Sequence, residues 1–413
     1  MIRVAIIGFG NRGSQYADLL RKSGRADIAA VADTRSKARD FAASVFSIPA
    51  DRLYGSADEF FARGKIADAV VIASADRYHF AEASAALKTG YDVLIEKPVA
   101  CTEADCRALA ALAAETGRTV MVCHVLRYSL FYREIKRLID GGAVGRVVSV
   151  RQSEDVAYWR AAHSYVRGPW AKAETSGPMI LTKSCHDLDI LRALCKGRCL
   201  SVSSYGGLTL FTPENAPSPA LYCRDCPVSV RKGCPFDAYK VYTEHSEYLS
   251  GNRFAGKVTG EAAVDAALKA DERLSRCVFR CDNDVVDHQA VNMLFEGGVT
   301  AQFAMNSLSA ADNRRIVVCG TAGEITGSFA DSLVTLTRFG QAPEVYDLAR
   351  RSEEAGCHGG GDRGLVEDFL SCVARRGGTD DWRTDLAEAL ESHYMAFAAE
   401  KSRLSGGRPV ELR

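Results

Sequence analysis

The sequence predicts an α/β fold in two parts: an N-terminal, doubly wound parallel sheet, followed by an α+β part with a large, mostly antiparallel open sheet. Up to residue 123, continuous apolar stretches alternate with amphipathic ones, which is typical of parallel strands covered by helices on both faces. Beyond residue 123, short β-branched stretches follow one another without regular helices between them. We therefore expect one domain over residues 1–123 and a second over residues 124–413.

The composition is that of an ordinary folded protein. The chain has 413 residues, with 52 basic and 52 acidic side chains, 47% hydrophobic residues and 25% charged residues. A balanced charge argues against nucleic-acid binding, which usually needs a basic surplus on one face. The N-terminus lacks the pattern of a signal peptide, and no apolar run approaches the roughly 20 residues of a membrane span. We therefore expect a cytoplasmic protein without nucleic-acid or membrane partners.

The first part starts with a β-branched strand that ends in glycine and leads into an amphipathic helix. The same alternation then repeats along the chain. The expected strands cover residues 4–7, 28–32, 67–73, 92–95 and 119–123, and the expected helices cover residues 14–25, 35–46, 80–89 and 102–116. Thr102 is the expected N-cap of the last of these helices, because an acidic first turn follows it.

The second part combines strands, an insertion and a closing helix. The expected strands cover residues 147–153, 199–210, 287–295, 299–306, 315–319 and 333–337. A Pro- and Cys-rich stretch over about residues 211–240, here called the Cys-rich insertion, interrupts them. Residues 385–404 predict a long helix, with Thr384 as its cap and glycines after its end.

A nucleotide site is indicated at the end of the first strand. Gly8-Phe9-Gly10-Asn11-Arg12-Gly13 is a G-x-G-x-x-G motif that opens a helix, and Asp33 follows at the end of the second strand. Such glycines let the backbone approach a pyrophosphate, and the acidic residue binds the adenosine ribose. Asp33 favours NAD, whereas Arg35 and Arg12 could accommodate the 2′-phosphate of NADP. We expect a dinucleotide-binding Rossmann domain that prefers NAD.

A candidate catalytic lysine follows the fourth strand. Glu96-Lys97-Pro98 places Lys97 at the carboxyl edge of the predicted parallel sheet, where ligands of such sheets bind. Oxidation of an alcohol needs a group that takes the hydroxyl proton, and a lysine, alone or with a histidine, can do this. An arbitrary Lys-Pro pair is more often a surface turn, so the assignment needs the further motifs below.

Several motifs recur along the chain in a specific combination. They are the glycine loop at residues 8–13, Ser74, His79, Gly90, Glu96-Lys97-Pro98, Arg127-Tyr128, Gly145 and Gly320-Thr321-Ala322-Gly323-Glu324. Together they resemble the glucose-fructose oxidoreductase / inositol dehydrogenase (Gfo/Idh/MocA) family over essentially the whole chain apart from the Cys-rich insertion. The resemblance implies NAD(P)-dependent chemistry on sugars or cyclitols, and a C-terminal sheet that mediates a homo-oligomer, either a dimer or a tetramer.

The resemblance also assigns catalytic roles. It carries a catalytic role onto Lys97, and it aligns a second motif with residues 182–189, in which His186 and Asp189 match the family pattern. The family's first aspartate is replaced by Thr182, so His186, aided by Lys183, becomes the candidate acid/base. We expect positions 182, 186 and 189 to share one face of a helix.

The candidate binding residues extend these motifs. Cofactor contacts are expected from Gly8, Phe9, Gly10, Asn11, Arg12, Gly13, Asp33, Arg35, Ser74, His79, Glu96 and Lys97. Substrate contacts are expected from Lys97, His124, Arg127, Tyr165, Arg167, Trp170, Lys183, His186, Asp284 and His358. Residues 163–170 mix aromatic and basic side chains in a way that suits a sugar, whereas solvated turns and caps are the alternative there and at Asp284 and His358.

The Cys-rich insertion suggests a metal. Cys223 and Cys226 form a C-x-x-C half-site, and Cys234 follows it. Cys277 and Cys281 lie four apart on a likely strand and hence on the same face, so either could be the fourth ligand; we assign Cys277, and Cys199 is a further option. Structural zinc is the leading interpretation, with an iron–sulfur cluster or unliganded thiols as the other two.

The leading functional hypothesis is an NAD(P)-dependent dehydrogenase that transfers a hydride between the nicotinamide and a secondary hydroxyl of a sugar, a sugar derivative or a cyclitol, with Lys97 and His186 handling the proton. The alternative is a redox-neutral glycoside hydrolase or lyase that oxidises, eliminates, adds and then reduces. The missing aspartate at Thr182 leaves room for the second chemistry. A non-catalytic nucleotide sensor is the third reading, and Lys97 and His186 argue against it.

Overall fold

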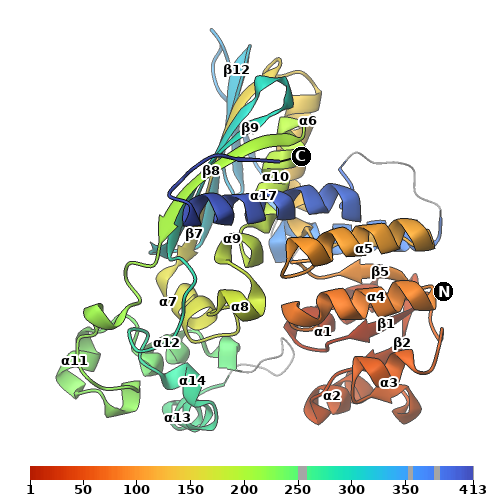
Figure 1. Cartoon of the computed structure of the whole chain (residues 1–413), viewed down its shortest axis with the longest axis vertical. Coiled ribbons are helices and arrows are strands. Elements are labelled where there is room, and N and C mark those ends of the chain that lie inside the picture. Colours follow the sequence, from red (N-terminus) through yellow and green to blue (C-terminus); the bar gives the residue numbers. More distant parts are fainter. Residues whose placement is uncertain (250–257, 352–356, 376–381, 413) are drawn as a thin grey trace.

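The computed structural model describes residues 1–249, 258–351, 357–375 and 382–412. Two sheets dominate it (Figure 1), and the chain carries the two-part α/β fold that the sequence predicts. The smaller sheet has six parallel strands in the order β3-β2-β1-β4-β5-β6. This order reverses direction between β1 and β4, as in nucleotide-binding doubly wound sheets.

The elements of the parallel sheet follow the predicted alternation. The strands are β1 Ile2–Ile7, β2 Ala26–Ala32, β3 Leu53–Tyr54, β4 Ala69–Ile72, β5 Asp92–Ile95 and β6 Val120–Val122, and the helices are α1 Asn11–Lys22, α2 Ser36–Phe46, α3 Ala57–Phe61, α4 His79–Thr89 and α5 Glu103–Thr116. All four residues of β4 are buried, as expected for a strand covered on both faces. Thr102 caps α5 as predicted, with its side chain accepting from the backbone N–H of Asp105.

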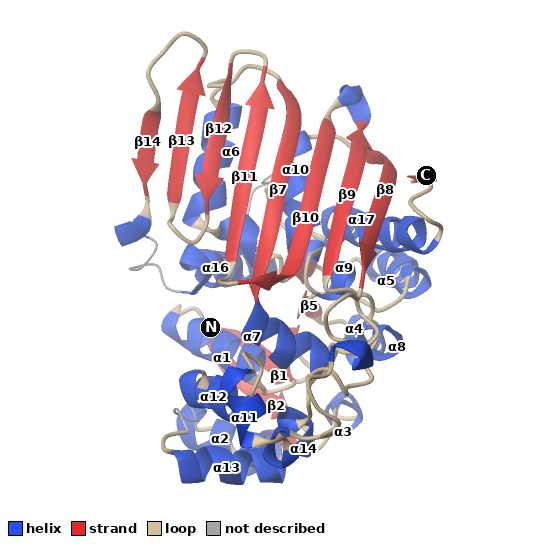
Figure 2. Cartoon of the chain, turned by 90° about the vertical axis from the view of Figure 1, so that its left-hand side faces the viewer, coloured by secondary structure: helices blue, strands red, loops and turns tan. Residues whose placement is uncertain are grey.

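The larger sheet has nine strands in the order β14-β13-β12-β11-β7-β10-β9-β8-β15 (Figure 2). They are β7 Val147–Ala157, β8 Cys199–Gly207, β9 His288–Phe295, β10 Thr300–Ser309, β11 Asn313–Gly320, β12 Gly323–Ser328, β13 Leu333–Arg338, β14 Glu344–Asp347 and β15 Val410–Glu411. Every neighbouring pair is antiparallel except β7 and β10, which run parallel. The sequence missed β12, β14 and β15, because these short strands are mostly polar or partly exposed.

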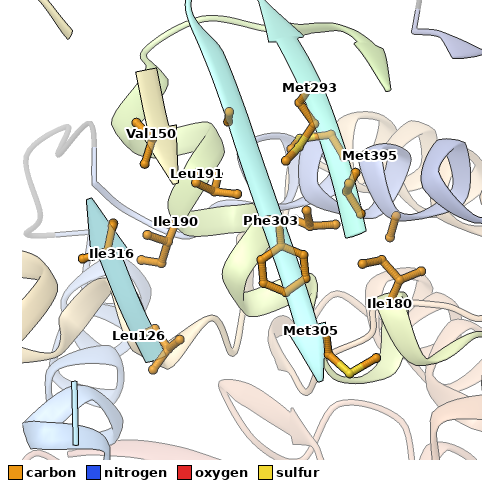
Figure 3. Close-up of a cluster of buried hydrophobic side chains, with 14 of the residues drawn as sticks. Leu126, Val150, Ile180, Ile190, Leu191, Met293, Phe303, Met305, Ile316 and Met395 are labelled. Carbon is orange, nitrogen blue, oxygen red and sulfur yellow. The ribbon is translucent and has the colours of Figure 1, made fainter. Parts of the chain in front are cut away.

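Helices cover one face of this sheet and leave the other open (Figure 2). The helices that contact its strands include α6 Leu130–Asp140, α7 Tyr158–Ala161, α10 Cys185–Cys195 and α17 Leu386–Leu404. The same part of the chain also forms α8 Ala173–Ser176, α9 Met179–Thr182 and α16 Gly361–Val373. Strict burial alternation along β9 and β10 fits a sheet with one packed face. Figure 3 shows the core on that face, where Phe303 and Met293 from the sheet meet Leu191 of α10 and Met395 of α17.

Two helices near the end of the chain return to the parallel sheet. Helix α16 packs against α1, and α17 contacts α5 and β6 as well as α10 and β8. The Cys-rich insertion and the residues after it add the short helices α11 Val228–Gly233, α12 Ala238–Glu244, α13 Glu261–Ala270 and α14 Glu272–Ser275. Helices from the C-terminal part of the chain therefore pack against the parallel sheet and its helices.

Three local expectations were wrong. The N-cap of α17 is Asp385, not Thr384. Helix α9 ends at Thr182 and α10 begins at Cys185, so Thr182 does not share a helix face with His186 and Asp189. The helical path breaks at Lys183 and Ser184, where a side chain at each position turns to Glu154 instead. Residues 277–281 form a turn rather than a strand, since Arg280 donates its backbone N–H to the Cys277 carbonyl at 2.9 Å.

Candidate active site

The glycine loop has the shape of a phosphate cradle. Gly8 has φ +83°, and a Cβ placed there would lie 2.5 Å from the Ala73 carbonyl oxygen. A Cβ on Gly13 would lie 1.9 Å from the Gly8 carbonyl oxygen. The following helix α1 starts after Gly10 without a side-chain cap, so its first backbone N–H groups remain available to an anion. These residues fit the pyrophosphate of a dinucleotide.

Asp33 lies beside this loop at the end of β2. Its carboxylate accepts from the Phe9 backbone N–H at 2.7 Å and from Arg35 Nε and Nη2 at 2.9 and 2.8 Å. Burial alone raises the pKa of Asp33, but these hydrogen bonds outweigh burial and leave the pKa below its usual value. The structure thus brings Asp33, Phe9 and Arg35 together as the sequence predicted, with an ionised carboxylate where an adenosine ribose would bind.

Arg12 does not point to solvent from the loop. Its Nε donates to Glu96 Oε1 at 2.5 Å, and its Nη2 lies 2.8 Å from Asp362 Oδ1 at the start of α16. The Tyr16 hydroxyl donates to the same Glu96 oxygen at 2.8 Å. Because Arg12 is committed to two carboxylates, it supports the loop instead of waiting for a 2′-phosphate. Sequence reasoning missed Tyr16, which no local motif marks, and it placed the segment that ends in Asp362 at a possible substrate pocket, not beside Arg12.

Ser74 and His79 brace the edge of the parallel sheet. The Ser74 hydroxyl donates to Glu82 at 2.5 Å. The buried His79 ring has Nδ1 2.6 Å from the Pro98 carbonyl oxygen and Nε2 3.2 Å from the Ser74 carbonyl oxygen. The two His79 contacts connect the segment after β4 to the Glu96-Lys97-Pro98 turn after β5. Ser74 and His79 therefore stabilise the position of this turn.

Lys97 joins the two halves of the chain. Its Nζ donates to the main-chain carbonyl of Thr182 at 2.6 Å, at the end of α9. The ammonium thus meets a backbone oxygen at the position where the family motif supplies an aspartate. The Thr182 hydroxyl turns away and donates to the Pro178 carbonyl at 3.4 Å.

His186 lies at the start of α10, partly exposed, beside this contact. Burial, the positive charge of Lys97 and then the nearby His124 hold the pKa of His186 well below its usual value. The imidazole is therefore neutral near pH 7 and can accept a proton.

The carboxylate of Asp76, in η2 (Asp76–Tyr78), lies close enough to Lys97 for the two charges to interact. Trp170 Nε1 donates to Asp76 Oδ2 at 2.8 Å, and the Tyr165 ring lies 5.9 Å from the Trp170 ring between centroids. Burial raises the pKa of Asp76, while His79 and Lys97 partly oppose that rise. The structure brings Trp170 and Tyr165, two of the predicted substrate residues, together beside Asp76. Asp76 itself was missed because it stands in an ordinary polar turn.

A buried charge network stands behind Lys183. The Lys183 ammonium contacts Glu154 on β7, and Arg314 on β11 bridges Glu154 to Asp187. Burial lowers the pKa of Lys183 to about 8, although Glu154 opposes this. Lys183 is thus turned away from Lys97 and toward the sheet.

Three further predicted substrate residues are committed elsewhere. Arg127 is fully buried, with Nε and Nη2 each 2.7 Å from the Asp189 carboxylate, and His124 is fully buried behind His186. Arg167 donates to the Phe236 and Arg276 carbonyls at 2.8 and 2.7 Å and so fastens the Cys-rich insertion. None of these three presents a polar group to the Lys97 site in this structure, because each guanidinium or ring is enclosed by protein.

Asp284 and His358, the last two predicted substrate residues, are each bound to a neighbouring part of the chain. Asp284 Oδ1 accepts from the Ala173 backbone N–H at 2.8 Å, so it caps the start of α8. His358 Nδ1 lies 2.6 Å from Asp362 Oδ2, and its side chain is 42% exposed. After burial, Lys97, His124 and Arg314, His358 is a further contributor to the lowered pKa of His186.

The metal prediction gains no support. Cys223 Sγ accepts from the Ala238 backbone N–H at 3.4 Å and from Arg167 at 3.6 Å, and Cys226 Sγ lies 3.3 Å from the Ser218 hydroxyl. Burial raises the pKa of Cys223 and of Cys234, which disfavours thiolates. Across the described ranges, no group of three or more His, Cys, Asp or Glu side chains is arranged to hold a metal, so Cys223, Cys226, Cys234 and Cys277 do not fit zinc here.

Family models cover nearly the whole chain. The NAD-binding Rossmann fold of the Gfo/Idh/MocA oxidoreductase family matches residues 2–124, and the C-terminal alpha/beta domain of the same family matches residues 136–412. The chain belongs to this family. Its N-terminal part is accordingly an NAD-binding Rossmann domain, as the glycine loop and Asp33 predicted.

Individual relatives are more distant. The chain is 25% identical over 317 residues to the putative oxidoreductase YteT of Bacillus subtilis, covering 73% of this chain and 72% of that protein. It is 31% identical over 206 residues to inositol 2-dehydrogenase 1 of Saccharopolyspora erythraea, covering 49% and 57%. It is 26% identical over 206 residues to 2,7-anhydro-N-acetylneuraminate hydratase of Mediterraneibacter gnavus, covering 49% and 52%.

The fold also matches solved structures end to end. The WlbA dehydrogenase of Bordetella pertussis, solved with NADH and UDP-GlcNAcA, superposes with a TM-score of 0.69 at 16% identity, covering 100% of this chain and 99% of that one. At this identity the likeness concerns the fold. Separately, a search of the described residues found no helix that is both long and apolar enough to span a membrane.

Proposed function

We propose that the protein transfers a hydride between a nicotinamide cofactor, preferably NAD, and a secondary hydroxyl of a sugar, a sugar derivative or a cyclitol. The observation that carries the proposal is the contact between Lys97 Nζ and the Thr182 carbonyl beside His186. It brings a cation and a neutral base together at the carboxyl edge of a nucleotide-binding sheet. The relationship to inositol 2-dehydrogenase 1 supports a polyhydroxylated substrate.

The glycine loop and Asp33 are the residues that would hold the cofactor. The loop offers the α1 N-terminus to a pyrophosphate, and Asp33 offers an ionised carboxylate to ribose hydroxyls. Bound nicotinamide supplies the hydride acceptor. NADP is the second choice, because Arg35 is 56% exposed and could turn toward a 2′-phosphate.

The remaining roles belong to side chains of this chain. Lys97 binds and polarises the reacting hydroxyl, and His186 takes its proton through the nitrogen that faces the site. Trp170 and Tyr165 supply aromatic faces that suit a sugar ring, with Asp76 and His358 as hydroxyl partners at its edge. A substrate without adjacent hydroxyls would leave these polar groups unpaired and should bind poorly.

A second candidate is the redox-neutral sequence of oxidation, elimination, addition and reduction. The hydratase relative favours it, as does the supply of acid groups. Asp76, whose pKa burial raises, and the His358–Asp362 pair could protonate a leaving group while Lys97 and His186 serve the redox step.

One assay separates the two candidates. Reduced-cofactor absorbance and aglycone release are followed together on free sugars, cyclitols and chromogenic glycosides with NAD or NADP, for the wild type, Lys97→Ala and the exposed control Lys88→Ala. Cofactor reduction that is lost only in Lys97→Ala supports the dehydrogenase. Release without net reduction supports the alternative, and equal rates in all three proteins would overturn both.

Two further expectations stay predictions. The open face of the large sheet carries exposed apolar residues, among them Leu294 on β9, Leu308 on β10 and Val148 on β7, which fits the homo-oligomer that we expect. Light scattering tests it, and a monomer would contradict it. A cytoplasmic location is likewise a prediction from sequence, and zinc has no part in the proposal.

A further inference from the structure

His124 is a buried histidine that the proposed chemistry leaves without a role. It follows β6, is 0% exposed, and has Nδ1 2.8 Å from Asp189 Oδ1. Arg127 holds both oxygens of that carboxylate, and Arg127 and His124 bring the pKa of Asp189 down to about 2 although burial alone would raise it. Facing an ionised carboxylate, His124 carries its proton on Nδ1 and presents a lone pair on Nε2.

That lone pair has no partner. His124 Nε2 and His186 Nδ1 are both buried side-chain nitrogens without a hydrogen bond, and His124 Nδ1, although 2.8 Å from Asp189 Oδ1, does not form one of good geometry either. The two rings lie edge to face with centroids 5.6 Å apart, so the two nitrogens come within hydrogen-bond reach when both point along the line between the rings. Unpaired polar atoms this deeply buried are rare in folded proteins, which indicates that the pair closes in the working enzyme.

The other neighbouring histidine is excluded as the partner. His393 on α17 stacks on His124 with centroids 5.7 Å apart. However, His393 Nε2 accepts from the Val99 backbone N–H at 2.9 Å, and Nδ1 lies 3.0 Å from the Ala389 carbonyl oxygen. Both of its ring nitrogens are already used, which leaves His186, the other histidine in ring contact with His124 among the described residues, as the candidate partner of His124 Nε2.

We propose that Asp189, His124 and His186 form a relay in which His124 Nε2 accepts a hydrogen bond from His186 Nδ1–H. This fixes the tautomer of His186 and leaves its Nε2 lone pair as the base that faces the substrate. The inference rests on the proposed function and deepens it, because it names how the base is set without the aspartate that Thr182 replaces. His124 is a positioning residue, since it acts only through His186.

Proton and hydride movements balance in this scheme. The substrate O–H bond breaks and its proton goes to His186 Nε2, while the C–H bond breaks and its electron pair leaves as hydride to the nicotinamide. The positive charge that His186 gains is stabilised through His124 by the Asp189 carboxylate, which stays ionised. The charged or titratable groups that face the pair are Lys97, Arg314 and His358 around His186, and Asp189, Arg127 and His393 around His124.

The first test reads the tautomer and needs no substrate. The chain has 8 histidines, so nitrogen-15 NMR of histidine-labelled protein can identify His186 by comparison with His186→Gln. We expect wild-type His186 to be protonated on Nδ1, and His124→Phe to shift it toward the Nε2-protonated form. The exposed His288→Gln, on the open face of the large sheet, should leave it unchanged.

Wild-type His186 protonated on Nε2 would overturn the relay, and so would a His124→Phe spectrum identical to the wild type. If His124→Phe does not fold, the wild-type tautomer decides alone. His124→Gln, whose amide oxygen can still accept, should then preserve that tautomer.

The second test uses the substrate found by the panel assay. His124→Phe should lower kcat roughly 10- to 100-fold with KM and NAD affinity nearly unchanged, and His124→Gln should restore part of kcat. Without Asp189 behind it, imidazolium is less stable, so the acid limb of the pH–rate profile should move to lower pH in His124→Phe. An equal fall for both variants with an unmoved limb contradicts the relay. Absence of any turnover with the expected tautomers would instead reject the proposed function alone.

Discussion

The nucleotide side and the substrate side of this site are built by different means. On the nucleotide side, a run of adjacent residues from Gly8 to Gly13 sets the loop through backbone geometry, and Arg12 joins it to Glu96. On the substrate side, Lys183 and Arg314 come from separate elements and are held by buried ion pairs. Both sides use long-range ion pairs, but only the nucleotide side adds a loop set by local backbone conformation, and its Arg12 is more exposed than Arg314, so substitutions should affect the two sides differently.

The largest loss of stability should follow removal of the Arg314 guanidinium on the substrate side. Arg314→Met leaves the buried carboxylates of Glu154 and Asp187 facing each other without their guanidinium. We expect the free energy of unfolding to fall by about 3–5 kcal/mol, measured by urea denaturation, because an uncompensated buried charge is costly.

The neighbouring Arg315 is a matched control. Its side chain is 61% exposed and pairs with Asp155 on the open face, so Arg315→Met should cost less than about 1 kcal/mol. Equal losses in the two variants would mean that solvent reaches the Arg314 network and that its burial does not strengthen it.

Replacing Arg12, on the nucleotide side, by methionine should lower the free energy of unfolding by less. Arg12 is 28% exposed, so water can partly replace its bonds to Glu96 and Asp362. We expect Arg12→Met to lower the free energy of unfolding by about 2–3 kcal/mol and to weaken NAD binding in calorimetry, since the glycine loop loses its support. Arg21→Met on the exposed face of α1 is the control. NAD affinity unchanged in Arg12→Met would show that the loop holds its shape alone.

The same difference explains what the sequence could predict. The parallel sheet, the glycine loop, Asp33 and Lys97 were all accessible, because each depends on hydrophobic periodicity or on glycines within a few residues. Trp170 and Tyr165 were proposed from composition as substrate residues, and the structure places their rings next to each other.

The long-range partners could not be found in this way. Asp362 reaches Arg12, and Asp189 reaches His124, only after the chain has folded. The same holds for His124, Arg127 and Arg167, whose side chains suited a sugar but are enclosed by carboxylate or carbonyl partners in the fold. The break between α9 and α10 was missed because the residues on either side have ordinary helical character.

Acid should affect both sides to a similar degree. Burial raises the pKa of Asp189, but Arg127 and His124 outweigh it and bring it to about 2, against roughly 3.9 in an unfolded chain. A carboxyl whose pKa is lowered in the folded state stabilises the fold fully above pH ~4, and this stabilisation is lost as the pH falls toward ~2. The free energy of unfolding should therefore fall by about 2–3 kcal/mol over this range.

Urea denaturation across this pH range checks the prediction. Asp189→Asn should give a flatter dependence of unfolding free energy on pH, even though its starting stability is lower. On the nucleotide side, the pKa of Asp362 is also lowered to about 2, so Asp362→Asn should likewise flatten the dependence of unfolding free energy on pH. A slope as steep in Asp189→Asn as in the wild type would assign the acid sensitivity to other groups.

The smallest effect concerns cofactor choice, at the most exposed point of the nucleotide side. Arg35 donates from Nε and Nη2 to Asp33, whose charge also repels a 2′-phosphate. Asp33→Ser should therefore release Arg35, weaken NAD and strengthen NADP, shifting the ratio of the two dissociation constants roughly tenfold, or about 1.4 kcal/mol. Calorimetric titration with each cofactor measures it, with the exposed Asp27→Ser on the same strand as control. The shift stays small because Arg35 is 56% exposed and screened by water, in contrast to the enclosed Arg314. An unchanged ratio would show that Arg35 does not face the adenosine ribose, and the nucleotide side would then owe its preference to the loop alone.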